Sequence, residues 1–204
     1  MDFKILKVAA TIKHTMVALK ANGINAYYVD NGEEAKRKVL QLIPKGAEVM
    51  TMSSVSLEAT GITKAINESD NYNSVKNKLS FMDRSTQGLE MQKLGAAPEY
   101  TVGSVHAVTE DGKVVVASNT GSQLPAYIYG SANVIWVVGV QKIVKDLEEA
   151  LKRIYDYILP LESNRLKKLY NITANSNVSK LIIINKEINL KRINLVLVND
   201  VLGF

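Results

Sequence analysis

The feature that most constrains the fold of this chain is an alternation between helical segments and short strands that are apolar on both faces. Residues 24–29, 47–52 and 134–138 form such strands, and the last of them reads Val-Ile-Trp-Val-Val without a polar residue. Strands of this kind are typical of a parallel sheet that is covered on both faces. The segments between them carry apolar residues three and four positions apart, which indicates amphipathic helices. The alternation therefore predicts an α/β fold, a three-layer α/β/α arrangement with a mainly parallel central sheet.

No linker, internal repeat or low-complexity segment interrupts this pattern, so we expect a single domain over residues 1–204. The first helix is predicted over residues 3–22, with Asn22-Gly23 as its C-terminal cap. A second helix is predicted to begin at the capping residue Asn31, with Glu34 three positions later completing a capping box.

A hairpin is the clearest local prediction. Residues 102–109 and 113–118 are apolar runs that flank Asp111-Gly112, and such runs around Asp-Gly favour a tight two-stranded turn. Late strands are predicted at residues 181–184 and 194–198. Together with the hairpin, they suggest antiparallel additions to the sheet.

Composition excludes several classes of function. The chain has no cysteine and two histidines, so it has no disulfide, thiol nucleophile, cysteine-held cluster or three-histidine metal site. We expect no metal site. No apolar run approaches the roughly 20 residues that a membrane helix needs, and the first residues form an amphipathic pattern instead of a signal-peptide core. We therefore expect a cytoplasmic protein without membrane insertion.

The net charge of +5 is a weak indicator of nucleic-acid binding. Basic residues are densest at residues 36–38, 167–168 and 191–192, each on or beside a predicted helix or strand. We interpret them as solvated faces, because nucleic-acid recognition calls for clustered basic residues interleaved with aromatic ones. A nucleic-acid partner is disfavoured, since charge alone is a sequence-independent attraction.

One candidate ligand site follows the strand that ends at Ser118. In open α/β sheets, ligands bind beyond the carboxyl ends of the strands, and small residues there let backbone N–H groups converge on an anion. The candidate ligand-binding residues of this turn are Ser118, Thr120, Gly121, Ser122 and Gln123, with a short helix predicted over residues 120–129. The turn matches neither a P-loop nor a Rossmann fingerprint. A tight helix cap explains the same residues equally well.

A second polar turn follows the strand at residues 47–52. Ser53 and Ser54 could face the same cleft as the first turn, and Glu58 falls in the first turn of the next helix. We treat all three as candidate ligand-binding residues. The alternative is purely structural, because serine is a good N-cap and a carboxylate near a helix start is favourable for dipole reasons alone.

Two further residues could carry chemistry. His106 lies within the strand at residues 102–109 and is a candidate ligand-binding residue, although a lone strand histidine is more often structural. Glu110 precedes the Asp-Gly turn and is the candidate catalytic residue, a carboxylate projected from a strand end as base or nucleophile. The alternative for Glu110 is a solvated turn residue.

Several runs of the sequence carry a family resemblance. Residues 101–112, 115–118 and 121–125 resemble the LUD domain of lactate-utilisation proteins, and residues 137–151, 53–62 and 196–204 are similar to further segments of that family. The resemblance spans most of the chain. It implies the fold of sugar-phosphate isomerases and coenzyme A transferases, a three-layer α/β domain.

The resemblance also implies a metabolic role. Some members of the family belong to lactate-oxidising systems in which a companion subunit carries iron–sulfur clusters, and this cysteine-free chain resembles the cluster-free members. It implies a subunit or accessory that binds an anionic small molecule, with an iron–sulfur partner subunit. It implies no specific cofactor, and a homo-oligomer remains open.

Two alternative functions stay open at this point. The first is a free-standing enzyme on an acyl-CoA, folate or sugar-phosphate substrate that uses Glu110, because residues 110–112 look like the Glu-x-Gly turn of coenzyme A transferases. A shared fold does not by itself transfer chemistry, so this comparison is an analogy. The second is a nucleic-acid-binding regulator, favoured only by the basic pI of about 9.2.

Overall fold

The computed structural model describes residues 2–171, 173 and 175–204. At its centre is a six-stranded sheet in which all paired neighbours are parallel. In sheet order the strands are β1 (Asn25–Val29), β10 (Ile193–Val198), β7 (Asn133–Gly139), β4 (Tyr100–Gly103), β2 (Glu48–Thr51) and β3 (Asn73–Ser74). The α/β class and the parallel central sheet are confirmed.

Helices cover both faces of this sheet because the central strands are apolar on both sides. On one face, Ile135 and Val137 of β7 pack with side chains of α2, α3 and α4. On the other face, Trp136 and Val138 pack with α1. These helices are α1 (Ala9–Ala21), α2 (Gly32–Leu42), α3 (Val55–Ala59) and α4 (Ile62–Asn67). The three-layer α/β/α arrangement follows from this division of the core.

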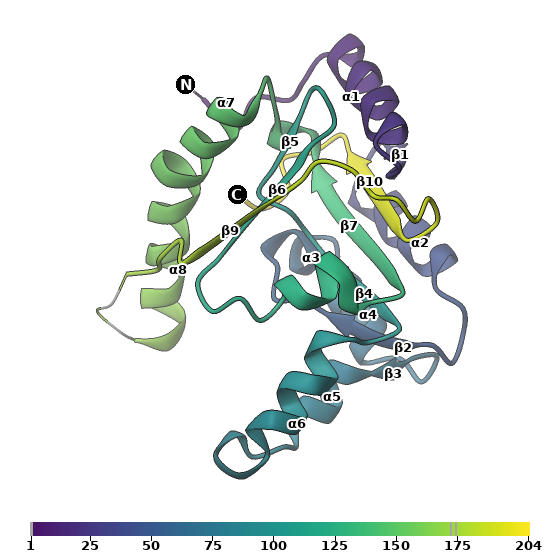
Figure 1. Cartoon of the computed structure of the whole chain (residues 1–204), viewed down its shortest axis with the longest axis vertical. Coiled ribbons are helices and arrows are strands. Elements are labelled where there is room, and N and C mark those ends of the chain that lie inside the picture. Colours follow the sequence, from purple (N-terminus) through teal and green to yellow (C-terminus); the bar gives the residue numbers. More distant parts are fainter. Residues whose placement is uncertain (1, 172, 174) are drawn as a thin grey trace.

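A smaller, four-stranded sheet packs on the same face as α1. In sheet order its strands are β8 (Ile143–Val144), β5 (Ala107–Thr109), β6 (Val114–Ser118) and β9 (Lys180–Ile184). The β5–β6 pair is antiparallel around Asp111-Gly112, which confirms the predicted hairpin, and β9 is also antiparallel to β6. The outer side of this sheet packs against a long helical run that forms one flank of the molecule in Figure 1. That run consists of α7 (Leu147–Lys152), η3 (Arg153–Ile158) and α8 (Leu159–Tyr170).

A helical arm projects from the edge of the central sheet beyond β3. It is formed by α5 (Val75–Ser80) and α6 (Arg84–Ala96) and lies at the bottom of Figure 1. No residue of α6 is buried. In the part of the chain that the structure describes, every helix is too short or too polar to cross a membrane.

The structure corrects four sequence-based expectations. Residues 102–109 do not form one strand, because the chain leaves the central sheet after Gly103 and enters the small sheet at Ala107. The late strand β10 is parallel and lies between β1 and β7, where an antiparallel addition was expected. The first helix begins only at Ala9. Residues 121–123 form a turn, and the π-helical segment η1 covers Ala126–Gly130.

Candidate functional site

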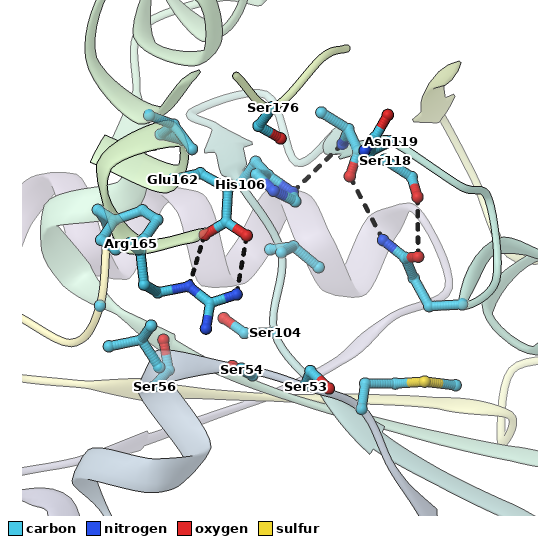
Figure 2. A pocket seen from close by; sticks show the side chains of 18 of the residues that line it. Ser53, Ser54, Ser56, Ser104, His106, Ser118, Asn119, Glu162, Arg165 and Ser176 are labelled. Atoms are coloured by element: carbon cyan, nitrogen blue, oxygen red, sulfur yellow. Dashed lines mark hydrogen bonds and ion pairs between the residues drawn. The ribbon is translucent and has the colours of Figure 1, made fainter. Parts of the chain in front are cut away.

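A cavity of about 410 Å³ opens beyond the carboxyl ends of the central strands. The chain leaves β2 toward β3 at one edge of the sheet and leaves β4 toward β7 in the opposite direction. Neighbouring strands whose connections diverge in this way create a crevice, and ligands of open α/β sheets bind there. Serines that follow β2 and β4 line the cavity together with residues of the small sheet and of α8 (Figure 2).

Lys142 lies at the base of this cavity and is 3% exposed. Its Nζ donates to Ser56 Oγ at 3.1 Å, Ser104 Oγ at 3.2 Å and Val105 O at 3.3 Å. Among the described residues, no carboxylate lies within ion-pair distance of this amine. Burial, reinforced by the positive charge of Arg153, lowers the pKa of Lys142 to about 7. The amine is therefore present in both charged and neutral forms near neutral pH.

His106 faces the same cavity from the segment between β4 and β5 (Figure 2). Its Nδ1 accepts a hydrogen bond from the backbone N–H of Ala117 at 3.2 Å. Burial and the charges of Lys142 and Arg153 lower the pKa of His106 to about 3. Because Nδ1 is an acceptor and the ring is neutral, the proton resides on Nε2. His106 thus offers a neutral N–H donor.

Arg153 is a fully buried cation beside these two groups. Its guanidinium lies over the rings of Phe3 and Tyr157, at 5.5 and 5.2 Å from their centroids. None of its three side-chain nitrogens has a hydrogen-bond partner in the described structure. Burial lowers the pKa of Arg153 to about 10, so it stays charged at neutral pH. Arg153 does not line the cavity itself, but its charge acts on Lys142 and His106, which do.

The serine turn after β2 contributes one wall of the cavity. Ser54 is the N-cap of α3, where its side chain accepts a hydrogen bond from Leu57 N at 3.4 Å. Ser53 Oγ accepts from Lys76 Nζ at 3.0 Å, and burial lowers the pKa of that lysine. Both serines line the cavity. Glu58 does not, because it lines a separate hollow beside α4.

The turn after β6 forms another wall, and Figure 2 shows Ser118 and Asn119 there. Ser118, Thr120, Ser122 and Gln123 line the cavity, whereas Gly121 does not. Gly121 N donates to Ser118 Oγ at 2.8 Å, and Ser122 N donates to Thr120 Oγ1 at 3.3 Å. Both backbone N–H groups donate to side chains of the same turn. A ligand in the cavity would therefore meet side chains of the turn and not these N–H groups.

Glu110 lies outside the cavity lining. The hairpin strand β5 begins next to His106 and runs away from the cavity, so Glu110 lies at the far end of β6 from Gly121. Its backbone N–H donates to Val144 O at 2.8 Å. The hairpin tip packs against α1, where a Cβ at Gly112 would come within 2.6 Å of Ala18 C. The structure therefore does not bring Glu110 together with the other candidate residues.

Several site residues were missed by the sequence analysis. Lys142 stands directly after Gln141 within an otherwise apolar run from residue 134 to 144, and a lone lysine in such a run is a signal of a buried amine. Arg153 and Ser104 carried no comparable signal. The cavity rim also holds Glu162 and Arg165 of α8, which form a bidentate ion pair at 2.7 and 2.8 Å (Figure 2).

The fold and the cavity define an α/β protein with a cavity at the carboxyl edge of a parallel sheet. One solved structure with this fold is that of a DUF162 family protein from Deinococcus radiodurans. It aligns over 96% of this chain and 100% of its own chain, with a TM-score of 0.59 and 9% sequence identity, so the likeness concerns the fold.

The family follows from the sequence itself. The model of the LUD domain matches residues 12–198, and the chain belongs to the LUD-domain family. No curated protein matches the sequence. Membership in this family supports a function related to lactate utilisation.

Proposed function

We propose that the chain binds a small anionic organic acid of the lactate and pyruvate type in the cavity beyond β2 and β4. In this proposal it acts in the cytoplasm as a cluster-free subunit or accessory of a lactate-oxidising system, beside a partner subunit that carries iron–sulfur clusters. Family membership supports the metabolic context. The positive charge at the cavity supports an anionic ligand.

The observation that carries the proposal is the uncompensated positive charge at the base of the cavity. Lys142 lines the cavity, and the buried Arg153 lies outside the lining but close enough for its charge to act on Lys142. Neither has a carboxylate partner among the described residues. Buried charges in proteins are normally paired, because an isolated charge loses its hydration. A carboxylate ligand would restore that pairing at Lys142. His106 Nε2–H and the cavity serines would complete its hydrogen bonds.

The size of the cavity agrees with a ligand of this class. A volume of about 410 Å³ is within the usual range for small-molecule sites and leaves room for a ligand larger than lactate. Lys76, on the serine side of the cavity, supplies a second cation for a longer or doubly charged acid.

Isothermal titration calorimetry with L-lactate, D-lactate and pyruvate tests the proposal, with uncharged glycerol as the comparison ligand. We expect binding of at least one acid and none of glycerol. Lys142→Met should weaken the binding at least about tenfold, the scale of one lost charge-assisted hydrogen bond. Lys13→Met changes an exposed lysine of α1 and should leave the affinity unchanged. Wild-type protein that binds none of the three acids would contradict the proposal.

A free-standing enzyme on an acyl-CoA, folate or sugar-phosphate substrate is the second candidate. This function would use Glu110, and the position of that residue at the far end of the hairpin from the cavity gives it no support. Titration of coenzyme A, a folate and a sugar phosphate in the same calorimeter compares this candidate directly with the first. Tighter binding of one of these ligands than of lactate and pyruvate would favour it.

A further inference from the structure

We propose that Ser104 and Lys142 form a nucleophile–base pair that cleaves an ester or thioester of a small organic acid. This activity goes beyond the binding of an anion. Ser104 lines the cavity at the carboxyl end of β4, and its Oγ lies 3.2 Å from Lys142 Nζ. The hydrogen bonds around the Lys142 amine are what single out this serine.

Among the described residues, one neighbour of Lys142, Ser104, can give the amine a proton. Val105 O, at 3.3 Å, is an acceptor only. Ser56 Oγ, at 3.1 Å, already donates its own proton to Leu202 O. A neutral amine would therefore donate its two N–H groups to these neighbours, and its lone pair would face Ser104. The Ser104 hydroxyl has no other acceptor among the described residues, so its proton is available to Lys142.

The electrostatics of the site keep this amine in a form that can act as a base. Burial lowers the pKa of Lys142 to about 7, and the Arg153 cation adds to the effect. The other titratable group that faces it, His106, has a pKa lowered to about 3 and is neutral near pH 7. A general base is most effective when its pKa lies near the working pH, and a serine hydroxyl needs such a base to become a nucleophile.

A hydrogen-bond donor for the developing oxyanion lies two residues further along. Ser104 and His106 both line the cavity, and Val105 between them is a buried residue of the hydrophobic core. The backbone here is held rigidly, since Tyr127 Oη donates to Ser104 O at 3.2 Å and Ala117 N donates to His106 Nδ1. His106 Nε2–H is thus a preorganised neutral donor of the kind that stabilises an oxyanion.

The chemical step balances with these groups alone and water. Lys142 Nζ takes the hydroxyl proton of Ser104 while Oγ bonds to the acyl carbon of the substrate. The C–S or C–O bond then breaks, and the leaving thiolate or alkoxide takes its proton from the Lys142 ammonium. Water hydrolyses the acyl-serine with Lys142 again as the base, which releases the organic acid and restores Ser104.

Labelling with a fluorophosphonate probe tests the pair on the whole protein. Ser104 Oγ bonds to phosphorus, the P–F bond breaks, fluoride leaves and Lys142 accepts the serine proton. We expect a single adduct that peptide mass spectrometry assigns to Ser104. Its rate should rise about tenfold per pH unit below pH 7 and level off above it, because only the neutral amine acts as a base.

Two variants and one control complete the experiment. Ser104→Ala should abolish the adduct, and Lys142→Met should slow labelling by about 100-fold and remove its dependence on pH. Ser80→Ala changes an exposed serine of α5 and should label like wild type. No adduct at Ser104, an adduct at another residue, or a rate that does not change with pH would overturn the proposal. Calorimetry of the wild-type protein with lactate separates the two proposals. Lactate binding without an adduct at Ser104 supports the first alone, and an adduct without lactate binding supports the second alone.

Discussion

At the scale of single residues, Arg153 carries three buried side-chain nitrogens without a hydrogen-bond partner among the described residues. Its guanidinium is fully buried, and burial of an unpartnered charge costs free energy. Stacking on Phe3 and Tyr157 offsets part of this cost, as cation–π contacts do. Arg153 does not line the cavity, but its charge contributes to the lowered pKa of Lys142 and His106, which do.

We therefore expect Arg153→Met to make the free protein more stable. The substitution removes an unpartnered buried charge and keeps most of the side-chain length, so the free energy of unfolding should rise by about 1–3 kcal/mol. Urea denaturation measures this difference. If pyruvate or lactate binds near Arg153, the same acid should stabilise the variant less than the wild type. A less stable variant would show that the aromatic stacking outweighs the desolvation of the guanidinium.

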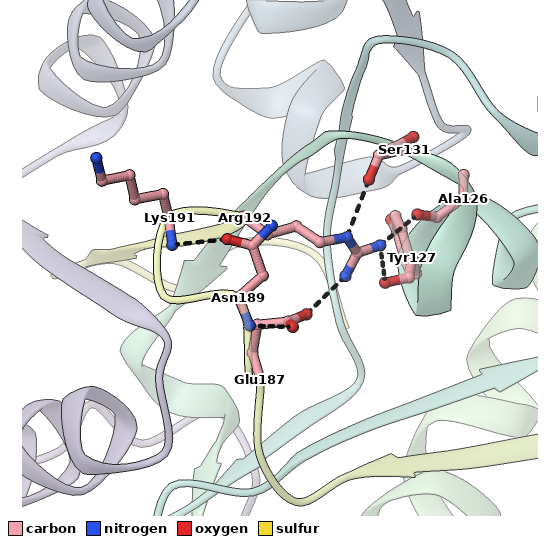
Figure 3. Close-up of polar contacts among 7 residues, drawn as sticks. All are labelled: Ala126, Tyr127, Ser131, Glu187, Asn189, Lys191 and Arg192. Atoms are coloured by element: carbon pink, nitrogen blue, oxygen red, sulfur yellow. Dashed lines mark hydrogen bonds and ion pairs between the residues drawn. The ribbon is translucent and has the colours of Figure 1, made fainter.

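At the scale of elements, a second buried arginine joins segments that lie far apart in the sequence. Arg192, just before β10, donates to Ser131 O at 2.9 Å and to Ala126 O and Tyr127 O of η1 at 3.0 and 2.9 Å (Figure 3). Its remaining nitrogen pairs with Glu187 at 2.8 Å. The pattern of basic residues predicts a solvated face at residues 191–192, and this is wrong for Arg192, which is 7% exposed. Its guanidinium hydrogen-bonds to carbonyl groups of η1 and pairs with Glu187, so it is not available to bind nucleic acid.

Arg192→Met should destabilise the protein by about 3–5 kcal/mol, because it leaves Glu187 and the carbonyls of η1 without their partner. Lys191→Met is the matched control, since the adjacent lysine is exposed and its loss should change the free energy of unfolding by less than about 0.5 kcal/mol. Denaturant titration of both variants gives the comparison. Equal stabilities for the two variants would refute a structural role of Arg192.

At the scale of the whole molecule, the described core is shared between the two sheets. Trp136, the only tryptophan, is fully buried in β7 and belongs to a cluster that also contains Val108 of β5 and Val116 of β6. The cluster links the central sheet to the small sheet. The absence of a linker in the sequence and this shared core both favour one cooperative unit.

We expect a single two-state unfolding transition. Trp136 fluorescence reports on the central sheet, whereas far-UV circular dichroism reports on all helices and strands. The two signals should give coincident urea curves, the standard test of two-state behaviour. Curves with separate midpoints would show that parts of the chain unfold independently and would contradict the single-domain prediction.

Several features of this protein follow from local sequence pattern alone. The apolar run of residues 134–138 predicted a strand covered on both faces, the Asp111-Gly112 turn predicted the hairpin, and Asn31 predicted the start of α2. Each of these follows from the conformational preferences and periodicity of neighbouring residues. The position of the cavity beyond the strand ends was also predictable, because parallel strands bring those ends to one edge.

Which side chains meet, and what charge they carry, depends on how distant segments of the chain pack together. The Lys142 amine is surrounded by groups from residues 56, 104 and 105, and its pKa depends on burial by all of them and on Arg153. Desolvation and Coulomb interactions act through space, so no local pattern encodes them. The position of Glu110 away from the cavity also depends on contacts between segments that are distant in the sequence. The hairpin turn was correct, but the direction of β5 relative to the cavity depends on its pairing with β8 and on the packing of the hairpin tip against α1.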